Sequence, residues 1–173
     1  MAVYKIFPEK DATLYSLFPN MNTGLDEIVE ATLTTFAYSN PNPQASRFLI
    51  KFSNEDLAAA ISPIPQADFN SLKWNATLQC FVATVTGLNA DTTIKCFPVA
   101  NSWDMGTGHY LDEPISTDGT SWVWADYSGS NSWVSNIPTG ATASYTSSVS
   151  AGGGTWYTGS QYSSSVTASV IVL

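Results

Sequence analysis

Apolar and polar residues alternate along three segments of this chain, a pattern typical of strands with one buried face. The first segment is Ser46–Phe52, with Phe48, Ile50 and Phe52 on one face and Arg47 and Lys51 on the other. The other two are Leu72–Val85 and Thr92–Val99, separated by a turn at Gly87–Asp91. Because their apolar positions match, with Cys80 and Cys96 both facing inward, they predict a β-hairpin.

Shorter β-branched and aromatic runs predict further strands, and a helix interrupts them. The helix is expected over Glu55–Ile61, because polar side chains precede it and Pro63 and Pro65 end it. The further strands are expected at residues 3–7, 12–17, 28–36, 121–125, 141–149 and 165–173. About nine strands with no sustained helical period predict an all-β fold, an antiparallel jelly-roll-like β-sandwich with one short helix. The length suits one well-buried core, so residues 1–173 are expected to form a single domain.

The charge is low, acidic and unevenly distributed. Charged residues make up 12% of the chain, the formal net charge is −8 and the pI is about 4.2. All Lys and Arg fall at or before Lys95, and no charged side chain follows Asp126. Nucleic-acid binding needs a basic face, so we do not expect it here. Low charge favours a protein that contacts neighbouring proteins, and the uncharged apolar end at Ser165–Leu173 needs a strand partner.

Neither a secretory signal nor a membrane span is predicted. The N-terminus MAVYKIFPEKD has no apolar core with a cleavage site, and no apolar run approaches the length of a membrane-spanning helix. The protein is therefore expected to act where it is made or to leave the cell by lysis, without a membrane partner.

The segment Asn101–Trp133 concentrates the candidate binding chemistry. It combines Gly, Ser, Asp and Pro with four tryptophans: Trp103, Trp122, Trp124 and Trp133. Such rings either fill a core or form a platform on which a sugar ring stacks, while neighbours such as Asp104 and Tyr110 contact the ligand. Trp122 and Trp124 are expected to share one face of a strand, being two residues apart. Packing in the core or between subunits is favoured for the four rings, because tryptophan is more often buried than displayed. The alternative is that at least one ring is displayed at the surface for ligand binding.

Other reactive side chains favour structural roles. His109 has no nucleophile motif beside it, so a surface-loop role is expected. The loop carboxylates are Asp104, Asp112, Glu113, Asp118 and Asp126. Turn formation is favoured for these acids over a structural calcium site, and catalysis comes last. Cys80 and Cys96 are expected to be thiols, because no secretory route is predicted. No catalytic residue and no cofactor are therefore predicted.

Three sequence blocks follow in order between about residues 10 and 160. They are Asp11–Ser16 with Pro19, Asn20, Asn22 and Gly24; Ser46–Phe52; and Cys96–Val99 followed by Trp103, Asp104, Gly106, Gly108, Asp112, Pro114, Gly119, Trp122 and Trp133. Together they resemble the DNRLRE-type domain, a β-sandwich related to carbohydrate-binding modules. The resemblance implies a domain of bacterial surface proteins or, without a signal peptide, of tailed-bacteriophage virion proteins. The first residues of this chain, Met1–Ile6, are similar to the start of the bacteriophage versions. The expected last strand pair is cut short at Leu173, which indicates a longer protein.

The residues and the resemblance together predict a non-enzymatic bacteriophage virion structural protein from the neck, tail or capsid exterior. It is expected to assemble in the host cytoplasm through contacts with other virion proteins and with itself as a homo-oligomer. The alternative is an extracellular or cell-surface carbohydrate-binding module that holds host-surface or other extracellular glycans with its loop tryptophans. A polysaccharide-cleaving enzyme is the third hypothesis.

Overall fold

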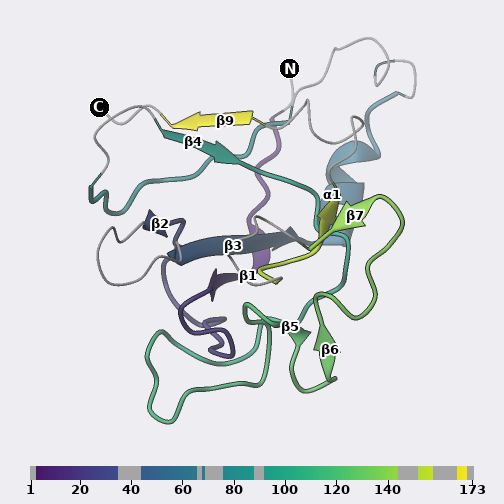
Figure 1. Ribbon diagram of the computed structural model, residues 1–173. Helices are drawn as coiled ribbons and strands as arrows, with labels where there is room; N and C mark the ends of the chain where they lie inside the picture. Colours follow the sequence, from purple (N-terminus) through teal and green to yellow (C-terminus); the bar gives the residue numbers. More distant parts are fainter. Residues whose placement is uncertain are drawn as a thin grey trace. The chain divides into compact units, whose positions relative to one another are not determined.

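The computed structural model describes residues 3–34, 44–65, 68, 76–87, 92–143, 152–157 and 167–170. Strands outweigh the short helix α1 in this part of the chain, which confirms the all-β prediction at the level of class (Figure 1). The elements are β1 (Pro8–Tyr15), β2 (Leu33–Thr34), β3 (Gln44–Phe52), α1 (Asn54–Ile61), β4 (Thr92–Lys95), β5 (Trp124–Asp126), β6 (Asn131–Ser132), β7 (Ala141–Thr142), β8 (Trp156–Tyr157) and β9 (Thr167–Val170). The chain divides into two compact units: the first holds Met1–Lys10 and Ile50–Gly87, and the second holds Asp11–Leu49 and Leu88–Leu173.

Strand pairing is antiparallel between β2 and β3, β4 and β9, β5 and β6, and β7 and β8. One sheet has three strands in the order β1-β3-β2, and three smaller sheets pair β4 with β9, β5 with β6 and β7 with β8. The register sets Leu33 opposite Ala45 in the first sheet, and Thr92 opposite Val170 in the β4–β9 pair. The uncharged C-terminal segment thus finds the strand partner that it was expected to need. The assembly of these strands into a jelly-roll sandwich stays a prediction.

The strand predicted at Ser46–Phe52 is confirmed as β3, but its most buried face is the opposite one. Ala45 and Leu49 belong to the core of the second unit, and Arg47 lies on the same face of the strand. The guanidinium carbon of Arg47 lies 4.9 Å from the ring centre of Trp122 and 4.6 Å from that of Trp156. Its Nη1 also donates to the carbonyls of Gly152, at 3.2 Å, and Gly153, at 2.7 Å. An arginine is accepted inside because stacking and hydrogen bonds replace its contacts with water.

The helix expected at Glu55–Ile61 is confirmed, with its start one residue earlier. In the first unit, Ser53 caps α1, and its side chain accepts a hydrogen bond from the backbone N–H of Asp56. Glu55 and Asp56 lie in the first turn, where carboxylates interact favourably with the helix dipole. The helix buries no side chain, so local capping rather than core packing defines it.

The hairpin predicted from Leu72–Val85 and Thr92–Val99 is wrong where the structure describes it. β4 pairs with β9, while residues 76–87 contain no strand and are exposed throughout, Cys80 included. Alternation indicates which side chains share a face, but it does not specify which backbone pairs with the strand. Residues 72–75 and 88–91 of the predicted hairpin lie outside the described residues.

Several shorter strand predictions also shift. Residues 3–7 form no strand, and β1 begins at Pro8, since proline is tolerated at the first position of a strand. The strands predicted at 28–36 and 121–125 correspond to β2 and β5. Those predicted at 141–149 and 165–173 correspond to β7 and β9. Residues 35–36, 144–149, 165–166 and 171–173 lie outside the described residues.

The core of the second unit is built around three indole rings. Trp103, Trp122 and Trp133 are buried together with small and aliphatic side chains: Ala12, Leu14, Ala45, Leu49 and Ala125. Trp133 donates its Nε1–H to the carbonyl of Ser121 at 2.8 Å, so its buried polar atom is satisfied. These rings therefore fill the interior between strand segments and loops far apart in the sequence.

Candidate functional site

A single buried side chain, Asn22, connects the loops of the second unit. Its Nδ2 donates to the carbonyls of Met105, at 2.7 Å, and Thr120, at 2.8 Å. Its Oδ1 accepts from the backbone N–H groups of Gly108, at 2.8 Å, and Gly24, at 3.2 Å. The amide thereby uses both donors and both acceptors that an asparagine side chain offers. Two of the three sequence blocks meet at this residue, and it holds the loops that carry the candidate site.

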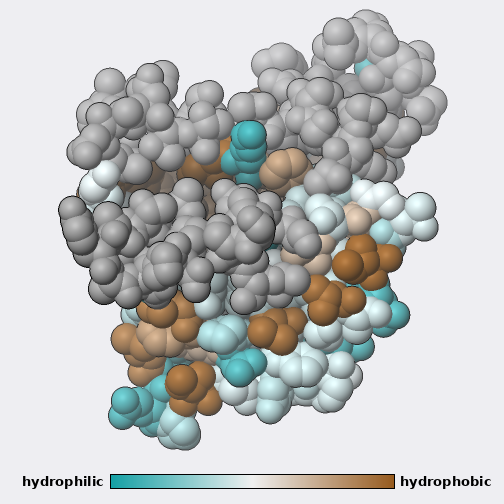
Figure 2. All heavy atoms as spheres, viewed as in Figure 1, coloured by the Kyte–Doolittle hydropathy of each residue, from teal (hydrophilic) through white to brown (hydrophobic). Residues whose placement is uncertain are grey.

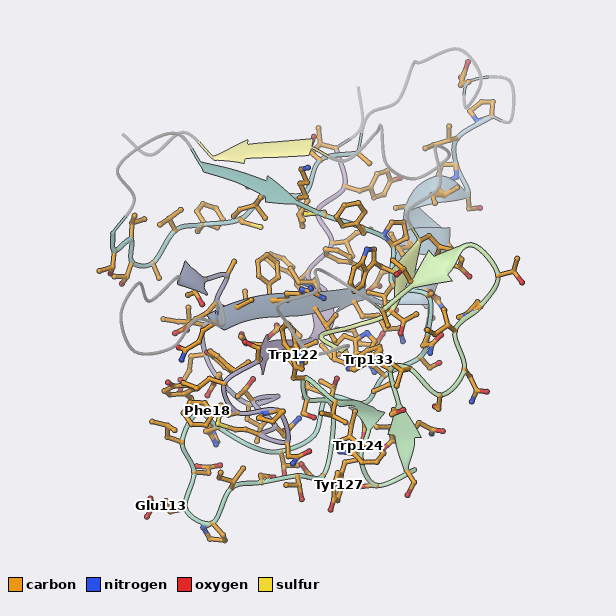
Figure 3. The ribbon with its side chains drawn as sticks, in the orientation of Figure 1. Phe18, Glu113, Trp122, Trp124, Tyr127 and Trp133 are labelled. Carbon is orange, nitrogen blue, oxygen red and sulfur yellow. The ribbon has the colours of Figure 1, made fainter. Side chains whose placement is uncertain are left out.

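The tryptophans predicted as candidate ligand contacts separate into two groups. Trp103 is 7% exposed, Trp122 1% and Trp133 0%, so these three rings belong to the core and a glycan does not reach them. Trp124 is half-buried and presents part of its ring at the surface. The expectation that Trp122 and Trp124 share a strand face is wrong, because β5 begins only at Trp124. Figure 3 shows Trp124 with Tyr127, apart from Trp122 and Trp133.

Trp124 and Tyr127 form two walls of a shallow open cavity of about 500 Å³. The two rings stand edge to face, with centroids 5.4 Å apart and planes at 84°. Polar side chains complete the lining: Thr117, Asp118, Ser128 and Ser130. An aromatic corner beside hydroxyl and carboxylate groups suits a ligand that has both a flat apolar face and hydroxyl groups.

The local sequence Asp126–Ser130 explains how Tyr127 comes to lie beside Trp124. The turn is closed by hydrogen bonds from the backbone N–H of Gly129 to Asp126 Oδ1, at 2.9 Å, and from that of Ser130 to the carbonyl of Tyr127, also at 2.9 Å. Ser130 has a positive φ of 56°, which lets β6 start directly after the turn. The indole N–H of Trp124 donates to Asn20 Oδ1 at 3.2 Å, which fixes the other wall.

Asp118 acts first as an organiser of the loop beside the cavity. Its Oδ2 accepts from Thr107 Oγ1 at 2.6 Å. Its Oδ1 accepts from the backbone N–H of Thr107 and from Ser116 Oγ, each at 3.0 Å. The hydrogen bonds from Thr107 hold the pKa of Asp118 below its ordinary value. The carboxylate is therefore ionised at neutral pH and supplies a fixed negative charge at one wall of the cavity.

Asp104 and Tyr110, the other two predicted site residues, do not line this cavity. The backbone of Asp104 pairs with Ala125 and Thr120, and its side chain is exposed. Tyr110 lies on a separate surface, with its ring 5.0 Å from that of Tyr15 and 6.1 Å from that of Phe18, centroid to centroid. Neither Tyr127 nor the hydroxyl groups around it were predicted as site residues from the sequence. The Asp-Tyr-Ser-Gly-Ser turn directly after β5 was the available signal.

The remaining reactive side chains are mostly accounted for by local contacts. His109 Nδ1 lies 3.6 Å from Asp112 Oδ2 at the surface, and that carboxylate also accepts the backbone N–H of His109. The prediction of thiols holds for Cys80 and Cys96, which form no disulfide. Among the described residues, no group of three or more His, Cys, Asp or Glu side chains is placed to hold a metal ion.

Comparison with other proteins adds no family assignment. The chain matches no protein-family profile, no curated protein and no solved structure. Within the ranges that the structure describes, no helix is long and apolar enough to cross a membrane.

Proposed function

We propose that this chain is a non-enzymatic structural protein of a bacteriophage virion, in the neck, tail or capsid exterior, and that it acts through protein–protein contacts. The observation that carries the proposal is the display of apolar side chains on well-anchored loops of the second unit. Leu25, Tyr110, Leu111 and Ile115 are each 44–52% exposed. Contiguous apolar surface on a soluble protein is typical of an interaction site.

The loops that display these side chains are held in place rather than loosely attached. The backbone N–H of Leu25 donates to the carbonyl of Gly108 at 3.0 Å, and that of Asn22 donates to the carbonyl of Ser116 at 3.0 Å. Together with the buried amide of Asn22, these bonds connect the loops to one another. A preorganised surface loses little conformational entropy on association, which suits a repeated contact within a particle. Symmetric assembly with further copies of the chain, through surfaces other than these loops, is also part of the proposal.

Sedimentation of intact particles tests this proposal. We expect the native protein to co-sediment with purified virions at a fixed stoichiometry and to stay with them through a wash at raised ionic strength. Dispersed protein that leaves the particle fraction would contradict a structural role in the virion.

A second candidate function is glycan binding at the Trp124–Tyr127 cavity. The specific observation in its favour is the edge-to-face aromatic corner beside Asp118, Ser128 and Ser130. A pyranose can stack its apolar face on the indole while its hydroxyl groups bond the polar wall. This function is compatible with a place on the particle exterior.

Affinity electrophoresis in polysaccharide gels and a glycan array test the second function. The Trp124→Ala and Tyr127→Ala variants should lose retardation, because each removes one wall of the cavity. Tyr4→Ala is the matched control, since Tyr4 is an exposed aromatic residue of the first unit. Retardation of the wild type that survives both cavity variants would exclude this cavity as the glycan site.

A further inference from the structure

Five apolar residues lie on one pair of loops of the second unit, which we call the Leu111 surface. Its apolar members are Phe18, Leu25, Tyr110, Leu111 and Ile115. The rings of Phe18 and Tyr110 are in edge contact, and the N–H of Leu111 points to Met21 Sδ at 3.4 Å. The backbone N–H of Leu25 donates to the carbonyl of Gly108, and that of Asn22 donates to the carbonyl of Ser116. These two hydrogen bonds join the loop that carries Leu25 to the loop that carries Ile115. Figure 2 shows apolar residues gathered over the loops in the lower part of the view.

The backbone at Leu111 is strained, although its side chain is exposed. Leu111 has a φ of 58°, a left-handed conformation that leucine rarely adopts, yet its side chain is 52% exposed. Such a conformation costs free energy and persists only where the surrounding structure enforces it. Here Met21 accepts the N–H of Leu111, and Asp26 Oδ1 accepts the N–H of Tyr110 at 2.9 Å. These hydrogen bonds hold the loop in a conformation that exposes the Leu111 side chain, which does not belong to the core cluster.

Charge around the Leu111 surface has one sign. Asp26, Glu27, Asp112 and Glu113 stand within its two loops, and Figure 3 shows Glu113 at the tip of one of them. Neither residues 11–46 nor residues 96–173 contain a Lys or Arg, so no lysine or arginine of these loops neutralises the acids. The one basic side chain of these loops is the imidazole of His109, which lies beside Asp112. An apolar centre with an acidic rim is complementary to an apolar segment that carries basic side chains.

We propose that the Leu111 surface binds a basic amphipathic segment of a partner protein, and this inference rests on the proposed role in protein–protein contacts. The partner's apolar residues cover Leu25, Leu111 and Ile115, and its Lys or Arg side chains face the acidic rim. A symmetric contact with a second copy of this chain does not fit, because it would place the same carboxylates against one another. The partner at this surface is therefore a different chain.

Titration of the intact protein with three synthetic peptides tests the inference by calorimetry. The first peptide is a short amphipathic helix of Leu and Lys, the second replaces Lys by Glu, and the third replaces Leu by Ser. We expect only the first to bind, with an affinity that falls as salt is raised because the rim charges are screened. Equal binding of the second peptide, or no binding of the first at low salt, would overturn the inference.

Variants locate the binding site. Leu111→Asn keeps a residue that tolerates the left-handed backbone and removes the apolar side chain, so we expect about tenfold or greater weakening. A Glu27→Gln, Glu113→Gln double variant should weaken binding and flatten its salt dependence. Ile137→Ser is the matched control, since Ile137 is similarly exposed at 45% but belongs to neither loop. Binding that is unchanged in Leu111→Asn, or weakened equally by Ile137→Ser, would overturn the proposal.

The two experiments separate the inference from the function on which it rests. If the protein co-sediments with virions but no peptide binds, the Leu111 surface is excluded while the structural role stands. If the peptide binds through Leu111 but the protein is absent from particles, the surface stands and the virion assignment fails.

Discussion

Replacing Asn22 by alanine should destabilise the second unit more than most single substitutions in this chain. The side chain is fully buried and makes hydrogen bonds to four different backbone groups. Alanine removes every one of these bonds and leaves two carbonyls and two N–H groups in the interior without their partner. The lost contacts span loops far apart in the sequence, so the expected effect is on global rather than local stability.

The magnitude follows from the number of groups left without a partner. An unsatisfied buried polar group costs about 1–3 kcal/mol, so four groups at the lower limit correspond to a loss of about 4 kcal/mol. Native domains have free energies of unfolding of about 5–15 kcal/mol, so this loss is a large fraction of the total. Asn22→Asp should also be damaging, because a carboxylate oxygen would then face the carbonyls of Met105 and Thr120.

Urea unfolding followed by tryptophan fluorescence measures the effect, because Trp103, Trp122 and Trp133 are buried. The control is Asn20→Ala, an exposed asparagine of the same turn whose side chain accepts a single hydrogen bond, from Trp124. We expect the control to change the free energy of unfolding by less than about 1 kcal/mol. If Asn22→Ala unfolds within about 1 kcal/mol of the wild type, Asn22 is not the buried link between these loops.

Three further substitutions test other parts of the second unit. Gly106→Ala should lower the free energy of unfolding by at least about 2 kcal/mol, since φ is +75° and the new methyl group would overlap the Asn22 side chain; a neutral result in urea would contradict that packing. Arg47→Met should cost about 2–4 kcal/mol by losing its stacking and its bonds to two carbonyls, and unchanged stability in the same assay would exclude a stabilising role. Asp118 has a pKa lower in the folded than in the unfolded protein, so its contribution is present above about pH 4 and is lost as the pH falls through the folded-state pKa. Asp118→Asn should therefore flatten the acid limb of the thermal midpoint against pH, and an unaltered limb would refute this linkage.

Local sequence was sufficient where an element depends on its own residues. The strand at β3 follows from strict alternation, and the helix α1 follows from Ser53 and two acids at its start. The residues Pro19, Asn20, Asn22 and Gly24 are of types that favour turns through their own local chemistry. The site was predicted only in part, since Trp124 was among the candidates and Tyr127 was not.

Long-range packing decided what local pattern left open. The face of β3 that turns inward carries Arg47, because Trp122, Trp156 and two glycine carbonyls, more than 70 residues away in the sequence, surround its guanidinium. β4 pairs with β9 rather than with its neighbour in sequence, since any backbone edge of suitable geometry can complete a ladder. The sequence by itself therefore determined the all-β class, the acidic character and the aromatic-rich segment. Only the tertiary structure decided which tryptophans are core, that Asn22 links the loops and that Leu111 is displayed, because burial depends on contacts between residues distant in the chain.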